Sequence, residues 1–329
     1  MNNFTYSQAT GIDNAVNEIT GHEKSMFIAG GTNLIDLMKE NVLHPDHLID
    51  INGLHLTSIE FLDDGRLFLG ALVTNADTAW HPEVEKKYPL LAEAILAGAS
   101  PQLRNMATNG GNLMQRTRCY YFYDTSTPCN KRTPGSGCSA INGYNRIHAI
   151  LGTSQHCIAV HPSDMCVALR AINAVVQVKG KAGERLIPIE HFHRLPAYTP
   201  QIDNNLAHDE LITGIILPRE HFNTHYKYLK VRDRASYAFA LVSVAVVLRL
   251  KEGVIDEIRI ALGGVAHKPW RDEGVENWLK DKPATDENFA EAADMILQEA
   301  KTFGANDFKP ALAKRAIVRA CREALNREI

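Results

Sequence analysis

The sequence predicts an α+β fold, and two features of its hydrophobic pattern support this class. Toward the N-terminus, short apolar segments typical of strands alternate with segments of helical periodicity, beginning with strands at residues 25–29 and 47–51 on either side of a helix at 33–40. Toward the C-terminus, long apolar strands precede two amphipathic helices. Between these regions, residues 115–160 are rich in Gly, Pro, Ser and Thr and follow no hydrophobic period.

These patterns divide the chain into three parts. We expect an α/β unit at residues 1–55, a second α/β unit at 56–220 with an insertion at about 115–160, and an α+β domain at 221–329. In the second part, the predicted strands are 58–61, 66–69 and 174–179, with a turn at Asp63-Asp64-Gly65, and the predicted helices are 75–80, 90–97 and 163–172. In the third part, the predicted strands are 226–231, 240–250 and 254–262, and the predicted helices are 287–302 and 308–324.

Composition and charge describe an ordinary globular chain. Its 329 residues, net charge of −3 and 45% hydrophobic content suit two or three domains with sizeable cores. No basic stripe invites nucleic acid, so we expect no nucleic-acid partner. The N-terminus lacks a positive segment followed by an apolar one, and no stretch approaches the roughly 20 apolar residues of a membrane span. We therefore expect neither an export signal nor a membrane anchor on this chain.

Four cysteines within and beside the irregular stretch are candidate metal ligands. They are Cys119, Cys129, Cys138 and Cys157. Four thiolates are the usual ligands of a [4Fe–4S] cluster, and a segment without a hydrophobic core could fold around an inorganic one. We therefore predict that these four residues bind one [4Fe–4S] cluster. Cys166 and Cys321 lie in helical apolar patterns and are expected to pack in the core.

The same four cysteines are also compatible with zinc, with disulfides or with simple packing. Structural zinc sites usually begin with a close C-x₂₋₄-C pair, which this sequence lacks. Disulfides would need an oxidising compartment. Free cysteines can also be small buried hydrophobes without any ligand. From the residues alone, packing and metal binding are about equally supported, and a cluster is favoured over zinc.

Two loops with paired glycines could hold a phosphate group. The first, from Ser25 to Leu34, runs from a predicted strand through Gly30-Gly31 into a predicted helix. The second, from Asn105 to Leu113, contains Asn109-Gly110-Gly111-Asn112. Glycines let the backbone approach an anion closely, although both segments also have the composition of plain turns. Neither is a P-loop or a Rossmann fingerprint, and two such loops in one chain favour a dinucleotide.

Together with a third motif, these loops resemble a known family. Residues 28–34 (IAGGTNL), 108–113 (TNGGNL) and 261–266 (ALGGVA) are similar to the FAD-binding subunit of molybdenum hydroxylases, the xanthine dehydrogenase and carbon monoxide dehydrogenase family. The stretch from Arg116 to Arg132 resembles the FAD and [4Fe–4S] subunit of three-subunit bacterial aldehyde oxidoreductases; a related insertion in 4-hydroxybenzoyl-CoA reductase makes that enzyme the alternative. The resemblance implies an α+β, PCMH-type (vanillyl-alcohol-oxidase-like) FAD-binding fold of two subdomains, followed by a carbon monoxide dehydrogenase flavoprotein C-terminal domain.

The resemblance also implies which residues bind FAD. Those expected around the pyrophosphate are Phe27, Ile28, Ala29, Gly30, Gly31, Thr32, Asn33 and Leu34, and those expected on its other side are Thr108, Gly111 and Asn112. Asp164 matches an acidic residue that faces the flavin, although a helix N-terminal carboxylate would look the same. Lys230 matches a cation near the flavin N1/O2 edge, with an ordinary solvated lysine as the alternative. Leu211 and Ile212 would pack on the isoalloxazine, or simply inside a buried strand.

The function implied by the resemblance is electron transfer within a heterotrimeric molybdenum enzyme that oxidises aldehydes to carboxylic acids. A large partner would hold the molybdenum cofactor, and a small partner with [2Fe–2S] centres would pass electrons to FAD in this chain and on to an external acceptor. No catalytic residue is therefore expected here. The competing hypotheses are a free-standing FAD reductase that uses NAD(P)H and an assembly scaffold with a zinc-bound cysteine loop.

Related complexes can be exported folded on a small subunit's twin-arginine signal, so we expect the periplasm, with the cytoplasm as the alternative. His191 and His193 lack the HExxH spacing of a zinc site and are expected on the surface. No Ser/His/Asp order suggests covalent hydrolysis.

Overall fold

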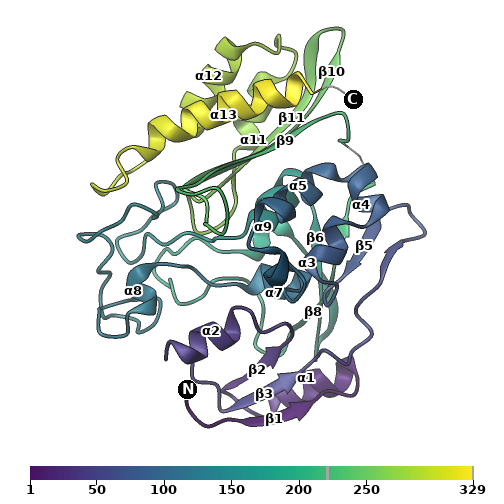
Figure 1. The fold of residues 1–329 in the computed structure, drawn as a ribbon, viewed down its shortest axis with the longest axis vertical. Coiled ribbons are helices and arrows are strands. Elements are labelled where there is room, and N and C mark those ends of the chain that lie inside the picture. Colours follow the sequence, from purple (N-terminus) through teal and green to yellow (C-terminus); the bar gives the residue numbers. More distant parts are fainter. Residues whose placement is uncertain (220–221, 328–329) are drawn as a thin grey trace.

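The described residues form three sheets, which follow one another along the long axis of the molecule (Figure 1). The computed structural model describes residues 1–219 and 222–327, so the boundary that we expected between residues 220 and 221 lies outside the described residues. No helix in these ranges is both long and apolar enough to cross a membrane.

The first sheet is parallel and has the strand order β1-β3-β2. Its elements are β1 (Thr5–Gln8), α1 (Ile12–Thr20), β2 (Ser25–Ile28), α2 (Leu34–Lys39) and β3 (His47–Asp50). The predicted strands at 25–29 and 47–51 and the predicted helix at 33–40 are confirmed to within a residue or two. β1 gives no signal in the sequence because it is an edge strand with mostly exposed side chains.

The second sheet is antiparallel and has the strand order β4-β5-β8-β6-β7. Its strands are β4 (Ile59–Phe61), β5 (Leu67–Gly70), β6 (Val175–Gly180), β7 (Gly183–Pro188) and β8 (Leu211–Leu217). The helices of this part are α3 (Asn75–Ala79), α4 (Pro82–Lys87), α5 (Pro89–Ala97), α6 (Pro101–Arg104), α7 (Asn109–Met114), α8 (Tyr120–Tyr123), α9 (Asp164–Ala171) and α10 (Ile189–Phe192). The largest hydrophobic core lies between this sheet, α5 and α9.

The third sheet is antiparallel and has the order β12-β11-β10-β9. Its elements are β9 (His225–Val231), β10 (Val242–Lys251), β11 (Val254–Gly263), β12 (Trp270–Arg271), α11 (Glu273–Leu279), α12 (Asp286–Ile296) and α13 (Lys309–Leu325). Along β10, Val244 and Val246 face a core with the C-terminal helices, whereas Ala245 and Val247 face the core of the second sheet. Both faces of β10 are therefore buried, which explains its continuous apolar run.

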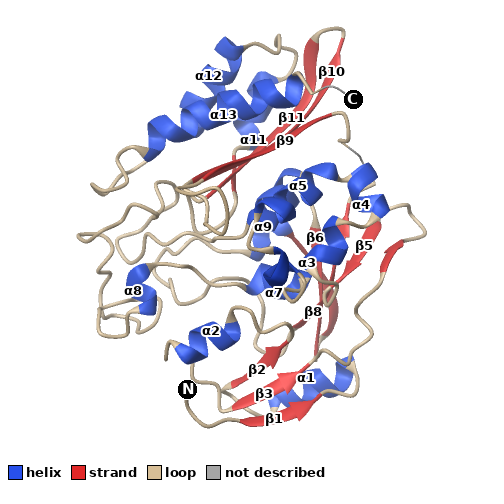
Figure 2. Ribbon diagram, in the orientation of Figure 1, coloured by secondary structure: helices blue, strands red, loops and turns tan. Residues whose placement is uncertain are grey.

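The stretch between α8 and α9 is a long excursion that carries no helix or strand among its described residues, as Figure 2 shows in tan. Side chains take over the hydrogen bonds that regular structure would make. Asn130 donates to the carbonyl of His156 and accepts from the N–H of Gly137, and Arg132 donates to the carbonyl of Phe122 at 2.8 Å. The stretch that lacks a hydrophobic period in the sequence is thus irregular in the structure, and side-chain hydrogen bonds hold its backbone.

The segment between α12 and α13, together with the first residue of α13, holds this excursion in place by hydrogen bonds. Asn145 donates to the carbonyl of Phe303 (2.6 Å), and Asn306 donates to the carbonyl of Ala149 (3.2 Å). Lys309, which is fully buried, donates to the carbonyls of His148 (2.7 Å) and Gly264 (2.6 Å). The helix predicted at 287–302 is too long, because the chain leaves it after Ile296 to make these contacts.

Candidate functional site

The four cysteines predicted as ligands line one pocket. Cys119, Cys129 and Cys157 are buried and Cys138 is partly buried, and Cys129 and Cys138 face each other across an isolated antiparallel bridge. All four are free thiols. No carboxylate belongs to the described lining of the pocket, whose metal donors are the four sulfur atoms and the imidazole of His156. Such a donor set fits an iron–sulfur cluster or zinc, and it does not fit Mg²⁺ or Ca²⁺.

Hydrogen-bond donors approach the sulfur atoms of this pocket. The Nε2 atom of His148 lies 3.0 Å from the Sγ atom of Cys119. A hydrogen bond with Cys157 lowers the pKa of the Cys138 thiol to about 6, and the same bond, together with burial, raises the pKa of Cys157. Donors aimed at sulfur stabilise thiolates, and hydrogen bonds of this kind tune iron–sulfur sites. His148 was not singled out by sequence reasoning, because nothing local to it marks its neighbour in space.

The two glycine loops are in direct contact. A Cβ atom on Gly30 would lie 1.8 Å from the carbonyl oxygen of Met106, and Gly31 has a left-handed φ of +69°. Only glycine fits the first position, because real Cβ atoms do not come that close to backbone. The side-chain nitrogen of Asn33 is buried without a hydrogen-bond partner among the described residues. The loops therefore form a narrow cradle with an unused donor, which suits a phosphate-containing cofactor.

The residues predicted in the second loop are tied into the fold. Thr108 is the N-cap of α7, and its hydroxyl accepts a hydrogen bond from the N–H of Gly111 (3.2 Å). Asn112 donates to Asn75 (2.7 Å) and accepts from the hydroxyl of Ser163 (2.5 Å). Because Ser163 directly precedes α9, Asn112 connects the glycine loop to the helix that carries Asp164.

Asp164 and Lys230 form a buried ion pair. The Nζ atom of Lys230 lies 2.8 Å from Asp164 Oδ2, and the side chains are 4% and 9% exposed. Tyr228 donates to the other carboxylate oxygen at 2.6 Å. Lys230 is therefore not the solvated lysine that was the alternative. Asp164 also lines a pocket with Arg118, His161 and the Gly263-Gly264 turn of the third glycine motif.

Leu211 and Ile212 lie elsewhere, at the start of the buried strand β8. Leu211 packs in the N-terminal core with Phe27 and Ala29, while Ile212 belongs to the core of the second sheet. Neither lines the Asp164 pocket. Their packing matches the buried-strand alternative, and their contact with flavin stays a prediction.

The expectation that His191 and His193 lie on the surface is wrong for His193. The side chain of His191 is 68% exposed, but His193 is 3% exposed and donates from Nε2 to the carbonyl of Leu113. His193 directly follows the short helix α10, whose end turns it inward toward His161, with a ring-centroid distance of 4.0 Å. Neighbouring residues at a helix end point in different directions, so sequence adjacency was a poor guide.

A largely buried ionic interaction connects the cysteine-containing stretch to the loop that carries Asp203. Asp203 accepts from Lys131 at 2.5 Å and from Arg116 at 2.7 Å, and the side chain of Lys131 is 1% exposed. Burial opposes ionisation of Asp203, yet the two cations hold its pKa well below its usual range. Its carboxylate therefore contributes stability above the ordinary pKa of 3.8, and this contribution is lost as the pH falls toward the lowered value.

We expect Asp203→Asn to lower the free energy of unfolding by about 3 kcal/mol at neutral pH, because Lys131 would stay buried without its partner. Urea titrations at neutral pH and at a series of values below 4 measure this, and the difference from wild type should shrink as the pH falls. Asp64→Asn, at an exposed pair with Arg66, is the control and should leave stability close to that of wild type, because solvent screens such a pair. Equal stability of Asp203→Asn and wild type at neutral pH would refute the role of the pair.

Comparison with known proteins identifies the class. Residues 2–220 match the FAD binding domain in molybdopterin dehydrogenase, and residues 225–324 match the CO dehydrogenase flavoprotein C-terminal domain. The chain belongs to the FAD-binding subunits of the molybdenum aldehyde oxidoreductase and xanthine dehydrogenase family. The predicted fold class is thereby confirmed, and the chain is a medium, FAD-binding subunit of a multi-subunit oxidoreductase.

Individual relatives make the placement more specific. The chain is 48% identical over 326 residues to the aldehyde oxidoreductase FAD-binding subunit PaoB of Escherichia coli (strain K12), covering 98% of this chain and 99% of the relative. It is 29% identical to the glyceraldehyde dehydrogenase medium chain of Sulfolobus acidocaldarius, covering 89% and 86%. Among solved structures, carbon monoxide dehydrogenase from Hydrogenophaga pseudoflava matches with a TM-score of 0.77 and 27% identity, covering 98% of each chain.

Proposed function

We propose that this chain is the FAD and [4Fe–4S] subunit of a heterotrimeric, molybdenum-dependent aldehyde oxidoreductase. The observation that carries the proposal is the pocket of four thiols in a chain that is 48% identical to the FAD-binding subunit of an aldehyde oxidoreductase. When bound, FAD and the cluster would transfer electrons from the [2Fe–2S] centres of a small partner to an external acceptor. The aldehyde itself would react at the molybdenum cofactor of a large partner.

The cradle of the two glycine loops would hold the FAD pyrophosphate. The loop from Phe27 to Leu34 lies on one side of it, and the loop from Thr108 to Asn112 lies on the other. The close approach of Gly30 to Met106 and the unpaired donor of Asn33 support this location. The isoalloxazine end would lie toward the pocket bordered by Asp164 and the Gly263-Gly264 turn.

The four cysteines would ligate the cluster, and their surroundings would shape its properties. His148 would donate from Nε2 to the thiolate of Cys119, because a ligating sulfur can only accept. Lys309 fixes the backbone of His148 and that of Gly264 with one ammonium group, and so links the thiol pocket with the Asp164 pocket. These chain residues orient and shield the site, while the redox chemistry belongs to the bound groups.

Co-purification from the native host tests the assembly and its compartment. We expect an iron–sulfur partner of roughly 20 kDa and a molybdenum partner of roughly 80 kDa, sizes that follow from typical domain sizes. We also expect the complex in the periplasmic fraction. The absorption spectrum should combine flavin bands with broad cluster absorption. A monomer that oxidises aldehydes without molybdenum would refute the proposal, and zinc in place of iron would instead favour the scaffold hypothesis.

The Asp164–Lys230 pair predicts opposite effects on the flavin potential. Removing the carboxylate in Asp164→Asn leaves a net positive charge beside the proposed flavin and should raise its reduction potential, whereas Lys230→Met should lower it. We expect shifts on the order of 20–60 mV, which correspond to about 1–3 kcal/mol for a two-electron couple. Spectroelectrochemical titration measures them. Shifts of the same sign in both variants would show that the pair acts through the fold rather than through its charge.

A further inference from the structure

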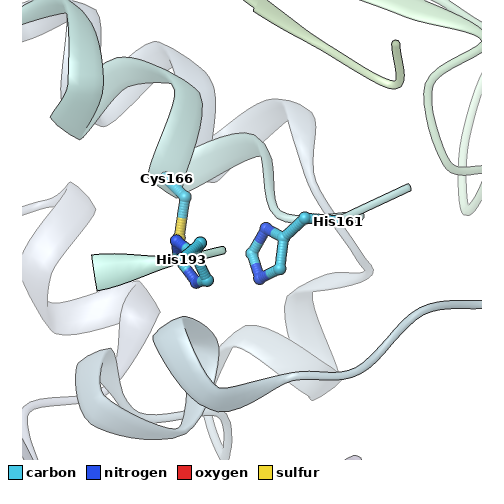
Figure 3. A group of neighbouring side chains, drawn as sticks. All are labelled: His161, Cys166 and His193. Atoms are coloured by element: carbon cyan, nitrogen blue, oxygen red, sulfur yellow. The ribbon is translucent and has the colours of Figure 1, made fainter. Parts of the chain in front are cut away.

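Three side chains outside the four-cysteine pocket form a second group of possible metal ligands. Figure 3 shows His161, Cys166 and His193 close together, with the sulfur of Cys166 directed toward the ring of His193. One ligand atom from each residue lies within 4.8 Å of the other two. His161 lies just before α9, Cys166 lies on α9, and His193 follows α10, so the group joins the start of α9 to the end of α10.

The hydrogen bonds around the two histidines leave their lone pairs unused. His193 Nε2 lies 2.9 Å from the carbonyl oxygen of Leu113, and because a carbonyl only accepts, the proton of the ring must be on Nε2. The lone pair is then on Nδ1, which is buried and unpartnered within the described part of the chain. Both ring nitrogens of His161 are also buried without a partner there. A histidine that binds a metal through one ring nitrogen usually donates a hydrogen bond from the other, which fixes its tautomer. His193 already makes such a bond to the carbonyl of Leu113.

Burial keeps the two imidazoles of the group neutral and the thiol protonated. Burial lowers the pKa of His193 to about 4 and that of His161 well below its usual value, so both rings are neutral at physiological pH. Burial raises the pKa of Cys166 to about 12, so its thiol is protonated until an ion displaces the proton. Unpaired buried nitrogens are costly, and coordination would satisfy them.

We propose that His161, Cys166 and His193 bind one thiophilic d¹⁰ ion, Zn²⁺ or Cu⁺, separate from the four-cysteine pocket. Two imidazoles and one thiolate suit both ions. Ligand atoms around such an ion are about 3.5 Å apart, so the three ligand atoms would move closer to one another by about 1 Å on binding. Zn²⁺ would add a water as fourth ligand on the side where His161 borders the Asp164 pocket, whereas Cu⁺ would need only three ligands. The ion would fasten α9 to the end of α10.

Metal analysis of the full chain, purified in its complex, tests this inference with matched controls. Wild type should contain about one zinc or copper per chain beyond the content of partner subunits, and Cys166→Ala and His193→Gln should each reduce it at least tenfold. Cys321→Ala removes another fully buried thiol, and His191→Gln removes the exposed neighbouring histidine, so both should keep the ion. Iron and flavin are counted in the same samples, which separates failure here from failure of the proposed function.

A metal titration tests the same site in preparations that have lost the ion during purification. One equivalent of Zn²⁺, Cu⁺ or the spectroscopic probe Co²⁺ is added to the complex, and thiolate-to-cobalt absorption reports coordination by Cys166. The signal should appear in wild type and in Cys321→Ala, and it should be absent from Cys166→Ala. If Cys166→Ala does not fold, His161→Gln at the pocket edge serves in its place. Wild type that contains no zinc or copper and takes up none of the three ions overturns the proposal, as does equal uptake by the variants.

Discussion

Cys157→Ser is expected to remove nearly all of the iron from this chain, and the same result is expected for Cys119→Ser, Cys129→Ser and Cys138→Ser. The four thiols line one pocket, so each would supply one corner of the cluster, and serine is a far poorer ligand for iron. Removing a residue that hydrogen-bonds to a metal ligand typically lowers metal affinity by roughly 10–100-fold. Removing a ligand itself should lower it by more. Colorimetric iron and acid-labile sulfide per chain are the measurements.

Cys321→Ser is the control for this series, because Cys321 is fully buried in α13 and packs in a different hydrophobic cluster from the four thiols. It should keep its iron. Unchanged iron in Cys157→Ser combined with iron loss in Cys166→Ser would show that the fourth ligand has been misassigned. Zinc analysis of the same samples would expose a zinc site in place of a cluster.

Gly30→Ala is expected to yield protein without flavin. The added methyl carbon would lie 1.8 Å from the carbonyl oxygen of Met106, so the two glycine loops would have to move apart and the proposed pyrophosphate cradle would open. Gly31→Val should act similarly, because its φ of +69° disfavours a branched side chain and Ile35 occupies the space. Flavin released by heat and measured against protein concentration gives the occupancy.

Gly11→Ala is a matched control, because no atom lies within 4 Å of a Cβ there and its backbone is extended. It should retain full flavin. Thr108→Ala should weaken flavin binding by only about 1–2 kcal/mol through loss of one hydrogen bond to a charged group. Circular dichroism separates loss of flavin from loss of fold. If Gly30→Ala is purified with its full complement of flavin, the cradle lies elsewhere in the chain.

Local patterns in the sequence were enough to predict most of the described strands, but fewer than half of the described helices. β2, β3, β9, β10 and β11 follow from short apolar runs with turns between them, and α13 follows from its amphipathic period. The exposed edge strand β1 carries no such pattern. The predicted helix at 287–302 exists but ends at Ile296, because tertiary contacts of the segment after Ile296 outweigh local helical preference.

The candidate site was only partly predictable, because its decisive contacts join distant segments. That four cysteines in one irregular stretch would share a pocket could be expected from their number and setting. The approach of Gly30 to Met106, the ion pair of Asp164 with Lys230, and the burial of His193 depend on how the sheets are placed. No periodicity or spacing encodes these neighbours, so only the folded chain reveals them.

The hydrogen bonds of Asn306 and Lys309 have a consequence for the order of biosynthesis. The cysteines leave the ribosome well before the segment that holds the backbone at His148 and Ala149, and domains generally begin to fold in the order of their synthesis. During that interval the thiols have been made, but the contacts that hold the backbone of His148, whose ring lies beside Cys119, are still absent. A metal group bound by these thiols would then be able to enter before α13 packs. A nascent chain released before Lys309 would lack these contacts, and its thiols would be more open to oxidation and to the wrong metals.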